Sequence, residues 1–278
     1  MQRDSGGGSD VRGLVLTILV CGSLTATPAF AVRCGGDFNT FIASFSSEAQ
    51  GGGISQDVIS QALGGVQIDG GVLAFDRRQR GTFKKTFEQY VSTRVGSGRI
   101  NGGRAMLQRH AALLSSIETK YGVPRQILVA IWGLETDFGK GDMGRLPVFR
   151  VLATLAHDCR RTELFQGELL AALKIVQRGD LPLREMIGAY AGEIGQTQFL
   201  PSSYIKYGVD FDGDGRVDLR HSVADVLAST ANLLHSNGFK MGAPYGEGTA
   251  NFEAMREWNH ATIYRMTIAY FADQLVGR

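Results

Sequence analysis

The fold of this sequence is decided by the stretch PRQILVAIWGLETDFG, which occupies residues 124–139. Its apolar side chains recur at the spacing of one helix face, and they are Ile127, Leu128, Ile131, Leu134 and Phe138. Pro124 suits the first turn of such a helix and Gly139 suits its end. The stretch therefore predicts a helix with a buried apolar face.

Glu135 follows Ile131 by four residues, so it lies on or beside this apolar face. A carboxyl in that position loses solvation and its pKa rises, because burial disfavours the charged form. A carboxylic acid that keeps its proton near neutral pH can act as a general acid. The alternative is a glutamate at the edge of the face that reaches solvent, and spacing alone leaves both open. Asp137 points elsewhere and is predicted to be ordinary surface.

The same helical spacing recurs along most of the chain. Strand signals are weak throughout, and no internal repeat or clear domain linker is present in the sequence. The expected fold class is mainly α. Besides the helix over 124–138, the predicted helices cover residues 38–49, 55–63, 82–95, 103–121, 148–158, 162–177, 200–207, 222–237 and 261–275.

Composition limits the range of functions. The chain has 278 residues, 44% of them hydrophobic, which suffices for a sizeable core in one large domain or two small ones. Its 29 basic and 27 acidic residues give a net charge of +2. This near-neutral balance offers no basis for a nucleic-acid partner, which would need a concentrated basic surface.

Residues 1–31 have the pattern of a secretory signal peptide. A polar, arginine-containing start precedes an apolar run over 14–26, and Ala29-Phe30-Ala31 supplies the small residues of a cleavage site. The run is shorter than the ~20 residues that span a bilayer, so no membrane-spanning segment is expected. No small residue precedes Cys21 or Cys34, which argues against a lipid anchor.

Cleavage after residue 31 would leave two cysteines, Cys34 and Cys159. In an oxidising compartment two thiols suggest one disulfide between them. The alternative is two separate free thiols, because sequence does not give the distance between them.

A second dense region, AYAGEIGQTQFLPSSY, occupies residues 189–204. Its glycines let the backbone approach a ligand closely. Glutamine amides and tyrosine hydroxyls bind sugar hydroxyl and acetamido groups without charge, and the candidates here are Tyr190 and Gln198. The alternative is a glycine-rich turn that enters a helix capped by Ser202.

An acidic loop, DFDGDGRVD, occupies residues 210–218 and matches the first nine positions of an EF-hand calcium loop. The sequence departs at the twelfth position, where His221 replaces the usual bidentate glutamate and the next acid is Asp225. A metal-free Asp/Gly turn is the alternative. The candidate ligands are Asp210, Asp212, Asp214, the carbonyl of Arg216, Asp218 and Asp225.

Taken together, these stretches resemble the lytic murein transglycosylases of the membrane-bound B family, from about residue 38 to residue 275. The resemblance implies a lysozyme-like core over about 84–278 with additional N-terminal helices. It places the whole catalytic unit at 32–278, after the signal peptide. The motifs that carry it are WGLETDFG (132–139), DCRR (158–161), GEIGQTQFLPSSY (192–204), DFDGDG (210–215) and Trp258-Asn259 followed by Tyr264.

The resemblance also implies a chemistry. The substrate would be the peptidoglycan glycan strand, cleaved between N-acetylmuramic acid and N-acetylglucosamine without water, and Glu135 would act as acid and then as base. No cofactor would be required beyond a candidate structural calcium. The protein would be periplasmic. Some relatives carry a lipid anchor or a separate peptidoglycan-binding module, and this sequence departs from them, so a short form without either is expected. The implied substrate-binding residues are Arg160, Arg161, Tyr190, Gln198, Trp258, Asn259 and Tyr264.

Two rival functions stay open at this point. One is a true hydrolase, a muramidase, in which Glu193 or Asp137 positions a water molecule. The other is a non-catalytic glycan-binding or scaffold protein.

Overall fold

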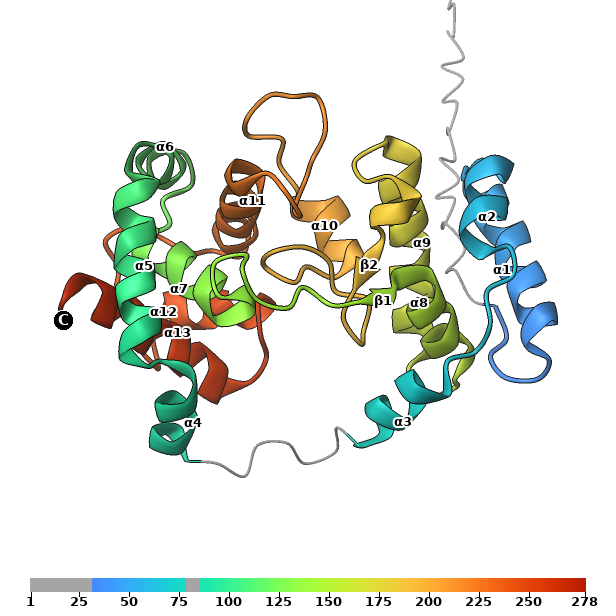
Figure 1. The fold of residues 1–278 in the computed structure, drawn as a ribbon, viewed down its shortest axis with the longest axis horizontal. Helices are drawn as coiled ribbons and strands as arrows, with labels where there is room; N and C mark the ends of the chain where they lie inside the picture. The colour runs from blue at the N-terminus through green and yellow to red at the C-terminus, as the bar shows by residue number, and fades with distance from the viewer. Residues whose placement is uncertain (1–31, 79–85) are drawn as a thin grey trace, which may run out of the picture.

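The computed structural model describes residues 32–78 and 86–278 and confirms the mainly helical fold class (Figure 1). The signal-peptide prediction and the start of the helix predicted over 82–95 lie outside the described residues. Within them the α-helices are α1 (Phe38–Gly51), α2 (Gln56–Leu63), α3 (Gly70–Arg78), α4 (Phe87–Arg94), α5 (Ser97–Arg109), α6 (Ala111–Tyr121), α7 (Arg125–Thr136), α8 (Val148–His157), α9 (Thr162–Arg178), α10 (Pro201–Tyr207), α11 (Val223–Ser236), α12 (Ala250–Ala254) and α13 (Thr262–Val276). Two 3₁₀ turns, η1 (Leu183–Glu185) and η2 (Met255–Glu257), complete the helical part.

A short antiparallel pair joins β1 (Leu146–Pro147) to β2 (Ile187–Gly188). In Figure 1 this pair lies beside α8, on the side toward the group containing α5, α7 and α13 and away from α1 and α2. The helices α8 and α9 form the other group. None of the helices in the two described ranges combines the length and the apolar character that crossing a membrane requires.

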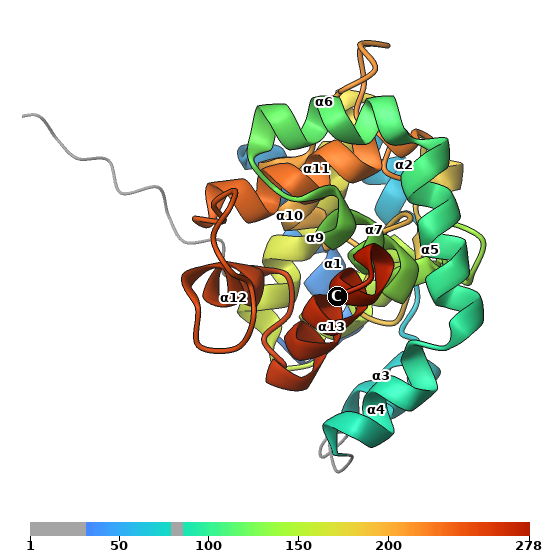
Figure 2. The ribbon, with the colours of Figure 1, turned by 90° about the vertical axis from the view of Figure 1, so that its left-hand side faces the viewer.

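Helix α7 forms the centre of the group that also contains α5 and α13. Nearly all of its residues are buried, and it packs against α5, α6, α11 and α13. Figure 2 shows α6 running alongside α11 over this centre. The helix predicted over 124–138 is therefore confirmed, and it is buried on more faces than its apolar stripe indicated.

Two predictions about helices need correction. The single helix predicted over 103–121 is two helices, α5 and α6, because the backbone at His110 leaves the helical conformation (φ −106°, ψ 25°). Helix α3 was not predicted, because it begins at a pair of glycines. The Asp69 carboxylate caps it by accepting the N–H groups of Gly71 and Val72 at 2.9 and 3.1 Å.

The N-terminal helices are fastened to the turn between α8 and α9. Cys34 and Cys159 form a disulfide, and the side chain of Gln166 exchanges two hydrogen bonds with the backbone of Val32. These links hold α1 to α3 beside the α8–α9 pair, on the right of Figure 1.

Candidate active site

A cleft of about 550 Å³ is lined by residues from both groups of helices. Its walls come from α3, the end of α7, α9, the 189–203 segment and residues 257–259. The cleft brings together predicted site residues from distant parts of the chain. They are Glu135, Arg161, Tyr190, Gln198, Trp258 and Asn259.

The carboxyl of Glu135 stands at the last turn of α7, where the helix meets the cleft. Tyr264 donates its hydroxyl to Oε1 at 2.7 Å, and the Trp258 indole N–H donates to the same oxygen at 3.1 Å. Among the described residues no hydrogen bond is assigned to Oε2. Both donors therefore act on one oxygen and leave the other available to a ligand.

Burial raises the pKa of Glu135 to about 7, and the negative charge of Glu193 adds to this rise. The hydrogen bonds from Tyr264 and Trp258 act in the opposite direction, because they stabilise the carboxylate, and so does the charge of Arg94. The position of Glu135 on the apolar face, rather than at a solvent-exposed edge, explains the net rise.

The backbone after Glu135 turns sharply. Asp137, Phe138 and Gly139 all have positive φ, between 49° and 76°. A Cβ at Gly139 would lie 2.3 Å from the side-chain oxygen of Gln196, so only glycine fits there. Asp137 is half-buried, and its carboxylate forms an ion pair with Arg99 of α5 at 3.2 Å. It is not among the residues that line the cleft.

Gln196 anchors the 189–200 turn to α7. Its Oε1 accepts the indole N–H of Trp132 at 2.9 Å, and its Nε2 donates to the carbonyl of Arg220 at 2.8 Å. Its own carbonyl accepts the hydroxyl of Thr136. Gln196 is buried and is not among the residues that line the cleft. Its hydrogen bonds hold the 189–200 turn against α7.

Gln198 lines the cleft in a left-handed backbone conformation, with φ of 54°. Its amide nitrogen donates to the carbonyls of Gly195 at 2.8 Å and Met143 at 3.3 Å. These bonds fix the amide plane, and no hydrogen bond to its oxygen is assigned among the described residues.

Tyr190 is 44% exposed and stacks on Phe75, with ring centroids 3.9 Å apart and planes inclined by 16°. Phe75 belongs to α3, so the N-terminal helices contribute directly to the cleft. Sequence reasoning missed Phe75 because it missed α3 itself.

Arg160 and Arg161 were predicted to reach substrate carboxylates. In the structure both guanidinium groups form ion pairs with Asp76, which is only 6% exposed. Arg160 also donates to the Asp76 carbonyl at 3.2 Å. Arg161 lines the cleft and Arg160 does not. Both charges therefore already have a partner inside the protein. The sequence could not predict this pairing, because Asp76 and Arg160 are 84 residues apart.

Trp258 and Tyr264 were predicted to bind substrate, and in the structure both donate hydrogen bonds to Glu135. Trp258 also packs edge-on against Phe199, with centroids 5.3 Å apart. Asn259 accepts the N–H of Ala261 at 2.9 Å just before α13. The late segment of the chain therefore controls the carboxyl as well as lining the cleft.

Glu168, on α9, is a cleft residue that the sequence did not indicate. It is 3% exposed and accepts two hydrogen bonds from Ser202, at 2.8 Å from its N–H and 2.6 Å from its hydroxyl. Burial raises its pKa. Ser202 therefore does not cap α10, which begins after Leu200 with Pro201 in its first turn.

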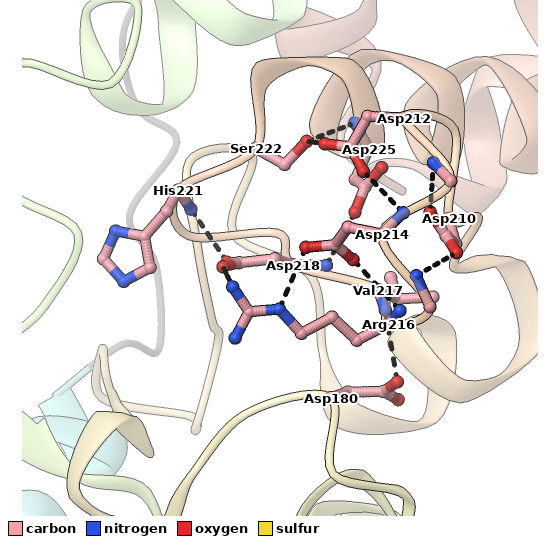
Figure 3. A network of polar contacts seen from close by, with 12 residues as sticks. Asp180, Asp210, Asp212, Asp214, Arg216, Val217, Asp218, His221, Ser222 and Asp225 are labelled. Carbon is pink, nitrogen blue, oxygen red and sulfur yellow. Dashed lines mark hydrogen bonds and ion pairs between the residues drawn. The ribbon is translucent and has the colours of Figure 1, made fainter.

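The acidic loop is shown in Figure 3, and it contributes none of the residues that line the cleft. Carboxylate oxygens of Asp210, Asp212 and Asp214 lie within 4.8 Å of one another. The Asp210 carboxylate also accepts the N–H groups of Gly213 and Gly215 at 2.7 and 2.9 Å. Three exposed carboxylates on a tight turn are a donor set that fits a hard cation.

The side chains of the other predicted ligands form hydrogen bonds and an ion pair within the protein. Buried Asp225 accepts the N–H groups of Phe211 and Asp218, each at 2.8 Å, and so holds the loop closed. Asp218 accepts the N–H groups of Arg220 and His221. The Arg216 guanidinium pairs with Asp214 at 3.1 Å (Figure 3). Of the six candidate ligands the structure thus gathers the first three carboxylates.

The helical architecture and a cleft with a protonatable carboxyl define a protein of the lysozyme-like class. The family model described as transglycosylase SLT domain matches residues 37–250, which is most of the chain. The chain therefore belongs to this family, as the sequence motifs predicted.

Three relatives illustrate the similarity. Membrane-bound lytic murein transglycosylase B of Escherichia coli (strain K12) is 38% identical over 145 residues, covering 51% of this chain but only 39% of that protein. SltB3 from Pseudomonas aeruginosa, in complex with NAG-anhNAM-pentapeptide, is 32% identical with a TM-score of 0.82, covering 87% of this chain and 80% of that one. The Escherichia coli lytic transglycosylase Slt35, in complex with calcium, is 25% identical with a TM-score of 0.76, covering 88% and 96%.

Proposed function

We propose that this chain is a peptidoglycan lytic transglycosylase. It cleaves the β-1,4 bond between N-acetylmuramic acid and N-acetylglucosamine and leaves a 1,6-anhydromuramic end. The observation that carries the proposal is the carboxyl of Glu135, which lines the cleft with a pKa of about 7. The SltB3 complexes with NAG-NAM-pentapeptide and NAG-anhNAM-pentapeptide support the choice of substrate class.

In the first step Glu135 donates its proton to the glycosidic oxygen, and the bond from that oxygen to C1 of the muramic residue breaks. The acetamido oxygen of the same residue stabilises the positive charge at C1. In the second step the Glu135 carboxylate accepts the proton of the C6 hydroxyl, and the C6 oxygen bonds to C1. Atoms and charge balance without water or a cofactor.

One carboxyl can serve both steps because opposing effects hold its pKa near 7. Burial favours the acid that the first step needs. The hydrogen bonds from Tyr264 and Trp258 favour the carboxylate that the second step needs. Both bonds end on Oε1, so Oε2 is the oxygen that exchanges the proton.

The remaining predicted residues keep their roles as proposals. Tyr190, Gln198 and Asn259 contact the glycan from the cleft wall. Arg161 forms ion pairs with carboxylates of the stem peptide. Arg160 chiefly holds α3 in place through Asp76. The catalytic unit is residues 32–278.

Mass spectrometry of digested peptidoglycan tests the proposal. The expected products of the unmodified protein carry anhydromuramic ends, and Glu135→Gln yields none while still binding the glycan. Glu163→Gln, which removes an exposed carboxylate on α9 outside the cleft, is the matched control. Reducing ends would favour a muramidase, and binding without cleavage would favour a scaffold.

We further propose that Asp210, Asp212 and Asp214, with the carbonyl of Arg216, hold a structural calcium ion. The clustering of the three carboxylates supports this. Calcium should raise the melting temperature of the unmodified protein and leave Asp212→Asn unchanged, with magnesium as control. An equal response of both proteins to millimolar calcium would refute the site.

We also propose a periplasmic location, because residues 1–31 have the pattern of a cleaved signal peptide. N-terminal sequencing of the exported protein should begin at Val32. A periplasmic protein that retains residue 1 would contradict the cleavage.

A further inference from the structure

Glu193 is a second carboxylate in the cleft, and it comes from a different segment than Glu135. Its Oε2 accepts the N–H of Ala191 at 2.9 Å, and its carbonyl accepts the N–H of Ala189 at 3.0 Å. A Cβ at Gly188 would lie 2.1 Å from that carbonyl oxygen, so the backbones pack closely there. The turn therefore fixes both the position and the direction of the Glu193 side chain.

The charged and titratable groups that act on Glu135 come from three parts of the molecule. Tyr264 on α13 donates a hydrogen bond, and Arg94 on α4 supplies the positive charge. Tyr90, also on α4, interacts electrostatically with Glu135. Glu193 supplies the negative charge. Its charge opposes the hydrogen bonds and Arg94, which all favour the carboxylate.

The same charge acts on Glu168. Burial is the main reason why the pKa of Glu168 is raised, and Glu193 contributes to the rise. The charge of Glu193 thus acts on two cleft carboxyls, of which Glu168 is buried and Glu135 is half-buried like Glu193 itself. Negative charge on all three would be unfavourable in one cleft, since like charges disfavour each other's ionised forms.

We propose that Glu193 is a positioning residue for the reaction: its carboxylate, fixed in the cleft by the Ala191 N–H, adds to burial in favouring the protonated form of Glu135, which can donate to the glycosidic oxygen. This rests on the proposed function of Glu135. Glu193 itself exchanges no proton with substrate. It acts only through Glu135, and it differs in this from the water-positioning base of a muramidase.

The inference is tested by titrating Glu135 directly, with carboxyl-¹³C glutamate and NMR, and Glu135→Gln identifies its signal. In Glu193→Gln the midpoint of Glu135 should move to lower pH. In Glu193→Asp, which restores the charge, it should return toward the original value. Glu163→Gln, which alters an exposed carboxylate outside the cleft, should leave it unchanged. An unchanged midpoint in a folded Glu193→Gln protein overturns the inference, whether or not the protein cleaves peptidoglycan.

The pH profile of cleavage gives the second readout. A lower midpoint leaves less protonated Glu135 at alkaline pH, so the ratio of kcat/KM at pH 8 to that at pH 5 should fall in Glu193→Gln. The fall is about threefold for each half pH unit by which the midpoint moves. The products should keep their anhydromuramic ends. Loss of activity by an equal factor at both pH values, or a change from anhydromuramic to reducing ends, would show that Glu193 acts otherwise.

Discussion

Replacing Glu135 with glutamine should stabilise the protein, and the gain should depend on pH. Glutamine keeps an oxygen for the hydrogen bonds from Tyr264 and Trp258. The amide nitrogen of the glutamine occupies the place of Oε2, but the glutamine side chain cannot ionise. The substitution therefore removes the cost of burying a negative charge and little else.

The size of the effect follows from the pKa of Glu135, which is about 7 in the folded protein against an ordinary value of 4.5. The folded protein holds its proton more tightly than the unfolded chain, so the wild type loses stability as pH rises from 4.5 to 7. Each pH unit between the two values corresponds to about 1.4 kcal/mol. Allowing for screening of the partly exposed side chain, the full loss is about 2 to 3 kcal/mol.

Urea denaturation of both proteins at pH values from 4 to 8.5 measures the difference in unfolding free energy. The two should agree near pH 4, where Glu135 is neutral in both states. The variant should be more stable by about 2 to 3 kcal/mol at pH 8. Glu163→Gln corrects for loss of an exposed carboxylate. A difference between Glu135→Gln and wild type that is constant with pH would refute the burial argument, and so would a variant that is less stable at pH 8.

Three further changes test contacts at Glu135, Asp76 and Gly144. Tyr264→Phe removes a hydrogen bond that favours the Glu135 carboxylate, so the pKa of Glu135 should rise and the alkaline limb of kcat/KM should move to higher pH; a shift to lower pH would contradict this. Asp76→Asn leaves two arginines without their buried partner and should cost about 2 kcal/mol of unfolding free energy in urea, since both arginines can regain some water; an unchanged urea midpoint would contradict it. Gly144→Ala places a Cβ 2.0 Å from a facing backbone carbon at φ +88°, whereas Gly242→Ala at φ +76° meets nothing within 4 Å. The first should be the less stable by about 2 kcal/mol, and equal stabilities would argue against the clash.

The helices that carry the site could be predicted wherever their boundaries have local signals. Pro124 and the apolar spacing located α7, and Ser55 and Ser222 cap α2 and α11 close to the predicted starts. The helical spacing placed Glu135 on or beside the apolar face, which is a local property of one helix, and the family resemblance then singled it out as the acid.

What escaped prediction depends on contacts between distant segments. Asp76 binds the two arginines across more than 80 residues, and Phe75 reaches Tyr190 from a helix that starts at glycines. Neither pairing leaves a periodic trace in sequence. The arginine pair is a clear case, because the family resemblance implied a contact with substrate carboxylates, whereas the pairing with Asp76 has no local signal in the sequence.

The motifs that revealed the family are also packing partners. Gln196 accepts hydrogen bonds from the indole of Trp132 and the hydroxyl of Thr136. Its side chain also packs against Gly139, where a Cβ would clash with it. Glu135 lies between the first two on the same helical turn, so its orientation depends on all three contacts. A substitution at Gly139 would push Gln196 away from Trp132 and displace the last turn of α7. The position of Glu135 thus depends on the packing of the 132–139 motif against the 192–204 motif. For this reason the presence of both motifs in one sequence is more informative than the presence of one alone.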